Sequence, residues 1–327
     1  MIKGFWSKLK KPIFVLAPMA NVTDAAFRFL ISNYGKPDVT WTEFVSVDGL
    51  CSAGKEKLLV DFWHSENEHP IVAQIFGAKP ENFYKVAQMI KQLGFDGIDI
   101  NMGCPDRAVL KQGAGGALIK NPELAREIIL ATKEGAPELP VSVKTRIGVS
   151  KPMLEEWFGF LAAQELAAIT AHLRTVKELS LVPAHWELIS KIVEILRSGN
   201  QETRPLILGN GDVLSLADAE QKVLETGADG VMIGRGIFGN PWLFNRETSI
   251  EKVPVHKRML AMIEHTKLFE RKFAGIKDFA VMKKHYKAYV NGFDGAKELR
   301  MNLMEAETSQ EAEELVEKFL IAQKIFV

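Results

Sequence analysis

The sequence has little cysteine, no long apolar run and no net charge. Only Cys51 and Cys104 occur among its 327 residues, and their separation fits neither a disulfide framework nor a CxxC metal site. No stretch approaches the roughly 20 apolar residues of a membrane-spanning helix, and Met1 to Pro12 lacks the apolar core of a signal peptide. These absences predict a cytoplasmic protein with no membrane segment and no metal site, in which cysteine chemistry involves a single residue.

The neutral total charge, 41 basic against 41 acidic side chains, argues at first against a nucleic-acid partner. The distribution along the chain is uneven, however. From Lys252 to Arg300 there are twelve Lys and Arg against five Asp and Glu, whereas Met301 to Val327 holds six Glu and two Lys. The neutral total therefore conceals a basic segment, which indicates an anionic partner.

Short apolar, β-branched runs alternate with helical patterns, and there are eight of them. The runs are Ile13–Ala17, Val39–Phe44, Ile71–Phe76, Gly97–Asn101, Val141–Thr145, Ala168–His172, Leu206–Gly209 and Gly230–Ile233. Between them lie amphipathic segments with apolar residues at helical spacing, as in 83–93. Asn121-Pro122 predicts the start of one helix, and Ser215 and Gly227 bracket another.

Eight strand-then-helix units require parallel strands, and that number favours a closed barrel over an open doubly wound sheet. A barrel of this kind needs about 250 residues, which leaves room for a modest appendage. After about Asn245 the β runs stop and the pattern becomes helical. We therefore predict a (β/α)8 TIM barrel over residues 1–245, followed by a smaller helical domain over 246–327.

In this fold the chemistry lies at the carboxyl ends of the strands. The candidate residues that follow or end the runs are Pro18, Met19, Gln74, Asn101, Cys104, Lys144, Arg146, His172, Arg174, Asn210, Gly211, Asp212, Gly234 and Arg235. Glycines after the last two strands, with Arg235 nearby, predict a phosphate site, although one such glycine turn taken alone fits a tight βα loop equally well.

Lys144 stands on an otherwise apolar strand and needs an anionic partner, either the negative edge of a reduced flavin or a neighbouring carboxylate. Arg146 shares its side of the strand and suits a carbonyl or phosphate oxygen. His172 and Arg174 also share a side, so they could contact ligand oxygens together. Cys104 follows a glycine and precedes a proline, which indicates a loop thiol able to donate a proton; for Cys51 we expect a small core residue.

The motifs as a set resemble those of the dihydrouridine synthase family over nearly the whole chain. They are Ala17-Pro18-Met19, Thr23-Asp24, Phe27-Arg28, Asn101 to Pro105 with Lys111 to Leu118, Lys144 to Gly148, and Gly209 to Asp212. In the helical segment, Met282 to His285 and Gly295 to Arg300 resemble the family's tRNA-binding helices.

The resemblance implies that NADPH reduces bound flavin mononucleotide (FMN), that flavin N5 delivers hydride to C6 of a uridine in tRNA, and that Cys104 protonates C5. The implied cofactor-binding residues are Pro18, Met19, Gln74, Lys144, His172, Asn210, Gly211, Asp212, Gly234 and Arg235. The implied substrate-binding residues are Asn101, Arg146, Arg174, Lys283, Lys284, His285 and Arg300. The base must leave its stack to reach such a pocket. No stable protein partner is implied, so a monomer is expected.

One position departs from the family, which usually has His-Gly-Arg-Thr where this chain has Leu173 after His172. If the glycine serves a close approach or a positive φ, leucine should alter the pocket. Two other functions stay open. A small-molecule flavin oxidoreductase, resembling dihydroorotate or dihydropyrimidine dehydrogenases, would not need the basic helices, and a non-catalytic RNA-binding homologue would tolerate Leu173.

Overall fold

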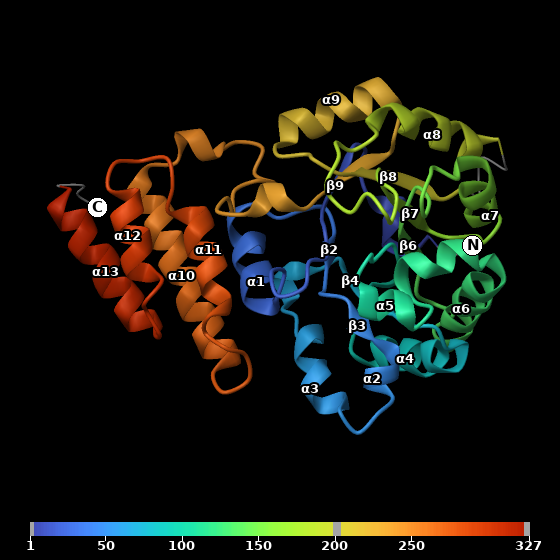
Figure 1. The fold of residues 1–327 in the computed structure, drawn as a ribbon, viewed down its shortest axis with the longest axis horizontal. Helices are drawn as coiled ribbons and strands as arrows, with labels where there is room; N and C mark the ends of the chain where they lie inside the picture. Colours follow the sequence, from blue (N-terminus) through green and yellow to red (C-terminus); the bar gives the residue numbers. More distant parts are fainter. Residues whose placement is uncertain (1–2, 199–203, 324–327) are drawn as a thin grey trace.

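The computed structural model describes residues 3–198 and 204–323, and a barrel of parallel strands occupies most of them (Figure 1). The strands are β1 Ile13–Leu16, β2 Thr40–Trp41, β3 Val45–Ser46, β4 Ile71–Phe76, β5 Gly97–Met102, β6 Val141–Arg146, β7 Ala168–His172, β8 Leu206–Asn210 and β9 Gly230–Ile233. Their order is β1-β9-β8-β7-β6-β5-β4-β2, and β3 also pairs with β4. A parallel bridge between Val15 and Val39 closes the ring.

The predicted (β/α)8 barrel is thus confirmed, with one local difference. The expected strand Val39–Phe44 is divided into β2 and β3, which both pair with β4. Between them, the Thr42 hydroxyl accepts the backbone N–H of Gln74 at 3.1 Å. A side-chain hydrogen bond therefore replaces a link of the strand ladder at this point.

Helices alternate with the strands around the barrel. They are α1 Ala25–Tyr34, α2 Val47–Leu50, α3 Lys55–Leu59, α4 Pro80–Gln92, α5 Arg107–Lys111, α6 Pro122–Gly135, α7 Gly159–Ala162, α8 Ile189–Arg197 and α9 Leu216–Thr226. Short 3₁₀ turns cover Gly4–Lys8, Val60–Phe62, Glu66–Glu68, Gly115–Lys120, Trp186–Leu188, Arg235–Ile237 and Ile250–Lys252, and a π turn covers Leu154–Phe158. The Asn121 side chain caps α6, while Ser215 and the left-handed Gly227 bound α9 as predicted.

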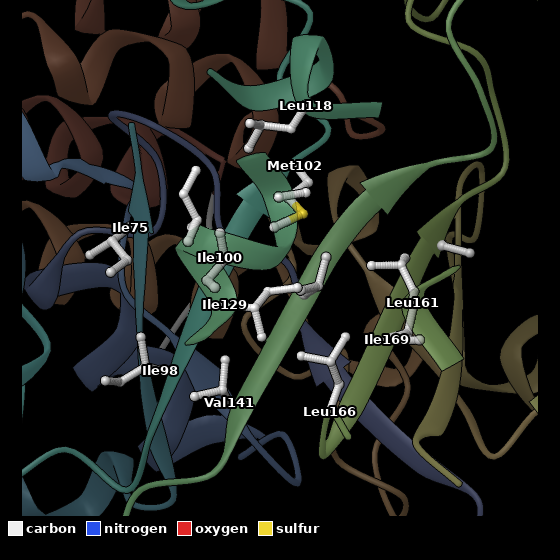
Figure 2. Close-up of a cluster of buried hydrophobic side chains, with 14 of the residues drawn as sticks. Ile75, Ile98, Ile100, Met102, Leu118, Ile129, Val141, Leu161, Leu166 and Ile169 are labelled. Atoms are coloured by element: carbon white, nitrogen blue, oxygen red, sulfur yellow. The ribbon is translucent and has the colours of Figure 1, made fainter. Parts of the chain in front are cut away.

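Alternation along each strand divides the barrel interior from the layer under the helices. On β5, Ile98, Ile100 and Met102 lie in the apolar cluster shown in Figure 2, together with Ile129 of α6. Because successive side chains of a strand point to opposite faces, Asp99 and Asn101 face the barrel interior. The polar residues of β5 therefore point into the barrel interior.

Four helices follow the barrel and form a group beside it, next to α1 (Figure 1). They are α10 Val255–Phe273, α11 Val281–Tyr289, α12 Ala296–Leu303 and α13 Ser309–Ala322. One apolar cluster joins Phe14 of β1 and Phe27 of α1 to Met259, Met262 and Phe269 of α10. Because the core is shared, the boundary after residue 245 stays a prediction.

Within residues 3–198 and 204–323, no helix combines the length and the apolar character needed to cross a membrane.

A buried ion cluster also connects the helical group to the barrel. The ammonium of Lys277, in the loop after α10, lies 2.9 Å from a Glu43 carboxylate oxygen and 2.8 Å from one of Asp61. Only 13% of the Lys277 side chain and 5% of that of Glu43 are exposed. Burial opposes the charge of Lys277, but the two carboxylates raise its pKa. Glu43 lies between β2 and β3, so this contact fixes the helices near the barrel mouth.

Replacing Lys277 with Met should lower the free energy of unfolding by about 3 kcal/mol, because the buried Glu43 carboxylate loses its cation. The matched control is Lys267→Met, whose partner Glu313 is exposed and should contribute less than about 1 kcal/mol. Urea denaturation followed by tryptophan fluorescence measures both variants. Equal losses would show that the Lys277 contacts stabilise the fold no more than a surface pair does.

Candidate active site

A pocket of about 320 Å³ opens at the carboxyl ends of the strands. All the predicted barrel residues line it: Pro18, Met19, Gln74, Asn101, Cys104, Lys144, Arg146, His172, Arg174, Asn210, Gly211, Asp212, Gly234 and Arg235. Strand register explains the convergence, because Arg146, His172 and Asn210 pair across β6, β7 and β8 at one level. The structure therefore brings together residues that are far apart in the chain.

The first loop of the pocket, Pro18-Met19, is held from beneath by buried polar contacts. The Met19 N–H donates to the Thr23 hydroxyl at 2.9 Å, and Asp24 caps α1. Arg28 donates to the Thr23 carbonyl at 2.6 Å and forms a fully buried ion pair with Glu68 at 2.7 Å. Three of the motif residues thus position the loop without lining the pocket.

The loop that carries Cys104 is fixed on two sides. The Asn101 amide oxygen accepts the N–H groups of Gly103 at 3.1 Å and Cys104 at 2.9 Å. On the other side the Cys104 carbonyl accepts the N–H of Gly116 at 3.0 Å. Gly115 has φ +60, and a Cβ there would lie 2.9 Å from the Cys104 carbonyl oxygen, so only glycine fits. These contacts fix the backbone that carries the Cys104 thiol at the pocket wall.

The thiol of Cys104 is protonated at neutral pH. Burial raises its pKa above the ordinary value of a cysteine. The charges of Arg146 and Lys144 act in the opposite direction but do not outweigh the burial. A neutral thiol can donate a proton, whereas a thiolate would serve as a nucleophile.

The pocket carries more positive than negative charge. Its cationic side chains are Lys144, Arg146, Arg174 and Arg235, whereas Asp212 is the one carboxylate among the described residues that line it. Asp212 bridges two of the cations, with oxygens 2.5 Å from Arg174 and 2.7 Å from Arg235. The pocket therefore suits an anionic ligand.

Lys144 donates to the Asn210 amide oxygen at 3.1 Å. None of the ion pairs among residues 3–198 and 204–323 includes it, so the expected alternative of a carboxylate contact is not found there. Burial, followed by the charge of Arg146, lowers the pKa of Lys144 to about 8. An anionic ligand beside this ammonium would stabilise its charged form.

Arg146 and Arg174 hold loops at the mouth. Arg146 donates to the carbonyls of Gly103 at 3.0 Å and Thr175 at 2.8 Å.

The position of Arg174 indicates the tautomer of His172. Arg174 lies 3.3 Å from Nε2 of His172, and because a guanidinium can only donate, this nitrogen accepts and Nδ1 carries the hydrogen. Burial and the surrounding cations lower the pKa of His172, so its ring is neutral.

Leu173 does not enter the pocket. Its side chain is fully buried in the apolar layer between strands and helices. Its N–H donates to the Asn210 carbonyl at 2.9 Å, its carbonyl accepts the His185 N–H at 2.7 Å, and its φ is not positive. Leu173 has no positive φ and does not line the pocket, so the positive-φ condition under which leucine was expected to alter the pocket is not met.

The predicted residues of the helical group lie outside the pocket. His285 is fully buried against the rings of Phe27 and His265, at 4.9 and 4.6 Å between ring centroids. Direct contact of His285 with RNA is therefore wrong, because no surface of it is available. Lys283 and Lys284 on α11 are partly exposed, and Arg300 on α12 donates to the Val290 carbonyl at 3.1 Å.

Some features escaped the sequence analysis. The pocket is also lined by Phe44, Ser180 and Leu214. Phe44 ends the predicted run Val39–Phe44 and could have been found by its place there, whereas Ser180 and Leu214 lie in irregular segments without a periodic pattern. Cys51 is exposed, so the expectation of a core residue was wrong. The described part of the chain contains no cluster of His, Cys, Asp or Glu arranged to hold a metal ion.

The comparisons with known proteins give the class to which this barrel and its pocket belong. Residues 15–324 match the family model described as dihydrouridine synthase (Dus). The chain is 41% identical to "Probable tRNA-dihydrouridine synthase" of Staphylococcus aureus (strain Mu50 / ATCC 700699), over 98% of this chain and 96% of that protein. It is 40% identical to "Probable tRNA-dihydrouridine synthase 2" of Bacillus subtilis (strain 168), over 98% and 97%.

Solved structures support the fold. Histamine dehydrogenase from Rhizobium sp. 4-9 is similar, with a TM-score of 0.55 and 14% identity, over 78% of this chain and 49% of that chain. The 2-naphthoyl-CoA reductase complex has a TM-score of 0.52 and 11% identity, over 72% and 49%. This chain spans about half the length of each.

The family description and the names of these relatives place the protein among the enzymes. The chain belongs to the dihydrouridine synthase family.

Iodoacetamide should alkylate Cys104 more slowly than the exposed Cys51 at pH 7, because only the thiolate reacts and burial raises the pKa of Cys104. The Cys104 rate should rise about tenfold per pH unit, in step with its thiolate fraction, and still be rising at pH 9. Peptide mass spectrometry at successive times follows both residues in one sample. Faster labelling of Cys104 at pH 7 would contradict a protonated thiol.

Proposed function

We propose that this chain is a tRNA-dihydrouridine synthase that uses bound FMN, reduced by NADPH, to reduce the C5–C6 double bond of a uridine in tRNA. The observation that carries the proposal is the position of the protonated Cys104 thiol in a pocket that otherwise carries surplus positive charge. The names of the family and of its relatives point to the same substrate.

The residues of the pocket fit a flavin nucleotide. The volume of the pocket lies in the range of small-molecule binding sites. At the ends of β8 and β9, a Cβ on Gly211 would lie 2.7 Å from that of Ala184, whereas a Cβ on Gly234 would lie 3.5 Å from the Cβ of Ala17, at ordinary van der Waals distance. These two glycines and Arg235 would hold the phosphate, while Pro18, Met19, Gln74, Asn210 and Asp212 would surround the rest of the nucleotide.

The bound flavin would supply hydride to the base, and NADPH would restore it. Lys144 and the neutral His172 would lie beside the ring system, where the Lys144 ammonium stabilises negative charge. Cys104 would donate its proton to C5 of the uracil. Asn101, Arg146 and Arg174 would position the base, either directly or through the loops that they hold.

The helical group supports RNA as the substrate. A base can reach a pocket inside the barrel mouth only when it leaves its stack. The rest of the tRNA therefore needs a separate binding surface. The basic segment from Lys252 to Arg300 lies on α10 to α12 beside the barrel and would neutralise phosphates there. Lys283, Lys284 and Arg300 are the candidate contacts, while His285 packs the interface beneath them.

Neither alternative has specific support in the structure. A small-molecule oxidoreductase on this barrel would leave the basic helices without a role. The only hint of a non-catalytic homologue was Leu173, which lies in the apolar layer away from the pocket.

Mapping of dihydrouridine in tRNA by mass spectrometry tests the activity directly. Cells that lack the gene should lose one or a few dihydrouridine sites, and wild-type protein should restore them. Cys104→Ala should restore none because the proton donor is lost, whereas Cys51→Ala, which removes an exposed thiol, should restore all of them. Full rescue by Cys104→Ala would refute its assigned role as the acid.

The variant Lys283→Glu tests the binding of tRNA by the basic helices, and Lys318→Glu on the acidic helix α13 is the control. Loss of one phosphate contact should raise KM for tRNA, leave kcat unchanged and reduce the slope of log binding constant against log salt by about 1. Lys318→Glu should change none of the three. The same slope in both variants would exclude Lys283 as a phosphate contact.

A further inference from the structure

A chain of hydrogen bonds leads from a buried carboxylate below the pocket to the loop of Cys104. The Gln74 amide nitrogen donates to one oxygen of Asp99 at 2.6 Å. The Gln74 amide oxygen accepts from the Asn101 amide nitrogen at 3.1 Å. The Asn101 oxygen in turn accepts the N–H groups of Gly103 and Cys104. Two side chains, those of Gln74 and Asn101, therefore connect Asp99 to the backbone beside the Cys104 thiol.

The sheet brings these side chains together. Asp99 and Asn101 both point inward from β5, because Ile98, Ile100 and Met102 occupy its outer face (Figure 2). Gln74 of β4 is the register partner of Asp99. Asp99 and Gln74 are fully buried, and Asn101 is 7% exposed. Asp99 does not line the pocket, whereas Gln74, Asn101 and Cys104 do.

Both ends of this series of hydrogen bonds have a defined direction of donation. A carboxylate can only accept hydrogen bonds, and a backbone N–H can only donate. Gln74 must therefore turn its NH2 group to Asp99 and its oxygen to Asn101, which leaves the Asn101 oxygen for the loop. Reversing either amide would place two donors or two acceptors face to face and leave buried groups without partners.

Asp99 is a carboxylate at neutral pH in spite of its burial. Burial raises its pKa to about 6, while hydrogen bonds from Ser142 and Gln74 and the charge of Lys144 limit the increase. A buried carboxylate is costly unless its oxygens are bonded. The Ser142 hydroxyl donates to the second oxygen at 2.6 Å. The contacts of Asp99 are therefore with the scaffold and with the amide chain.

We propose that Asp99 is a positioning residue, which sets the direction of the Gln74 and Asn101 amides and through them holds the loop that presents Cys104. Its effect on the loop follows from geometry alone. Its effect on turnover rests on the function proposed above.

Three variants separate this role from general stability. Asp99→Leu removes the acceptor at similar volume. Asp99→Asn removes the charge but keeps an oxygen that can face Gln74, with its NH2 group turned to the Ser142 hydroxyl. Ser142→Ala deletes a hydrogen bond of the same length to the other carboxylate oxygen and leaves the amide chain intact.

The first measurement is hydrogen exchange of the Gly103 and Cys104 N–H groups in the protein with its bound cofactor. Exchange should be about tenfold faster in Asp99→Leu, as expected for the weakening of one hydrogen bond, and stay within about twofold of wild type in the other two variants. The second measurement is turnover. The kcat of Asp99→Leu should fall about tenfold or more at unchanged KM for tRNA, because the thiol is misplaced while the tRNA contacts lie elsewhere.

Unchanged exchange in Asp99→Leu would overturn the proposal, as would equal acceleration in Ser142→Ala, which would indicate general loosening. Exchange as fast in Asp99→Asn as in Asp99→Leu would assign the effect to charge and overturn the amide account. If Asp99→Leu does not melt cooperatively, Asp99→Ala, which adds no volume, is judged by the same criteria. A wild-type protein without activity on tRNA would refute the proposed function, and the exchange rates would still decide the role of Asp99.

Discussion

The site depends on the surplus of positive charge at the barrel mouth. Arg146 and Arg174 are buried and Lys144 is partly buried, and Asp212 is the one carboxylate among the described residues that line the pocket with them. Such charges are costly unless their donors are satisfied, and here backbone carbonyls and the Asn210 amide accept them. An anionic ligand would complete this arrangement. Burial lowers the pKa of Lys144 and raises that of the Cys104 thiol, so one environment influences the protonation of both side chains.

The barrel produces this environment because the two faces of each strand have different roles. The outer faces, such as Ile98 and Ile100 in Figure 2, pack under the helices and stabilise the fold. The inner faces carry polar side chains whose ends converge at the carboxyl rim. Leu173 illustrates the rule, since its side chain lies in the outer layer and does not line the pocket. Asp99 lies one level below the rim and determines how the amides above it are oriented.

The helical group is part of the same body as the barrel. A common apolar cluster and the contacts of Lys277 with Glu43 and Asp61 hold α10 and its neighbours beside the mouth. These contacts place the basic helices beside the barrel mouth. They also explain why His285, within a basic segment, packs against Phe27 of α1.

The sequence by itself determined the barrel, because eight strand-helix units and their apolar periods are local properties. It also determined which residues reach the rim, since the end of a run marks its place in this fold. Only the tertiary structure decided which side chains of the protein are buried and which are exposed. His285 is enclosed, Cys51 is exposed, Leu173 turns outward and Asp99 acquires its partners through contacts made by segments distant in the chain. Local patterns carry no record of such contacts, because burial depends on what packs over a residue and not on its neighbours in sequence.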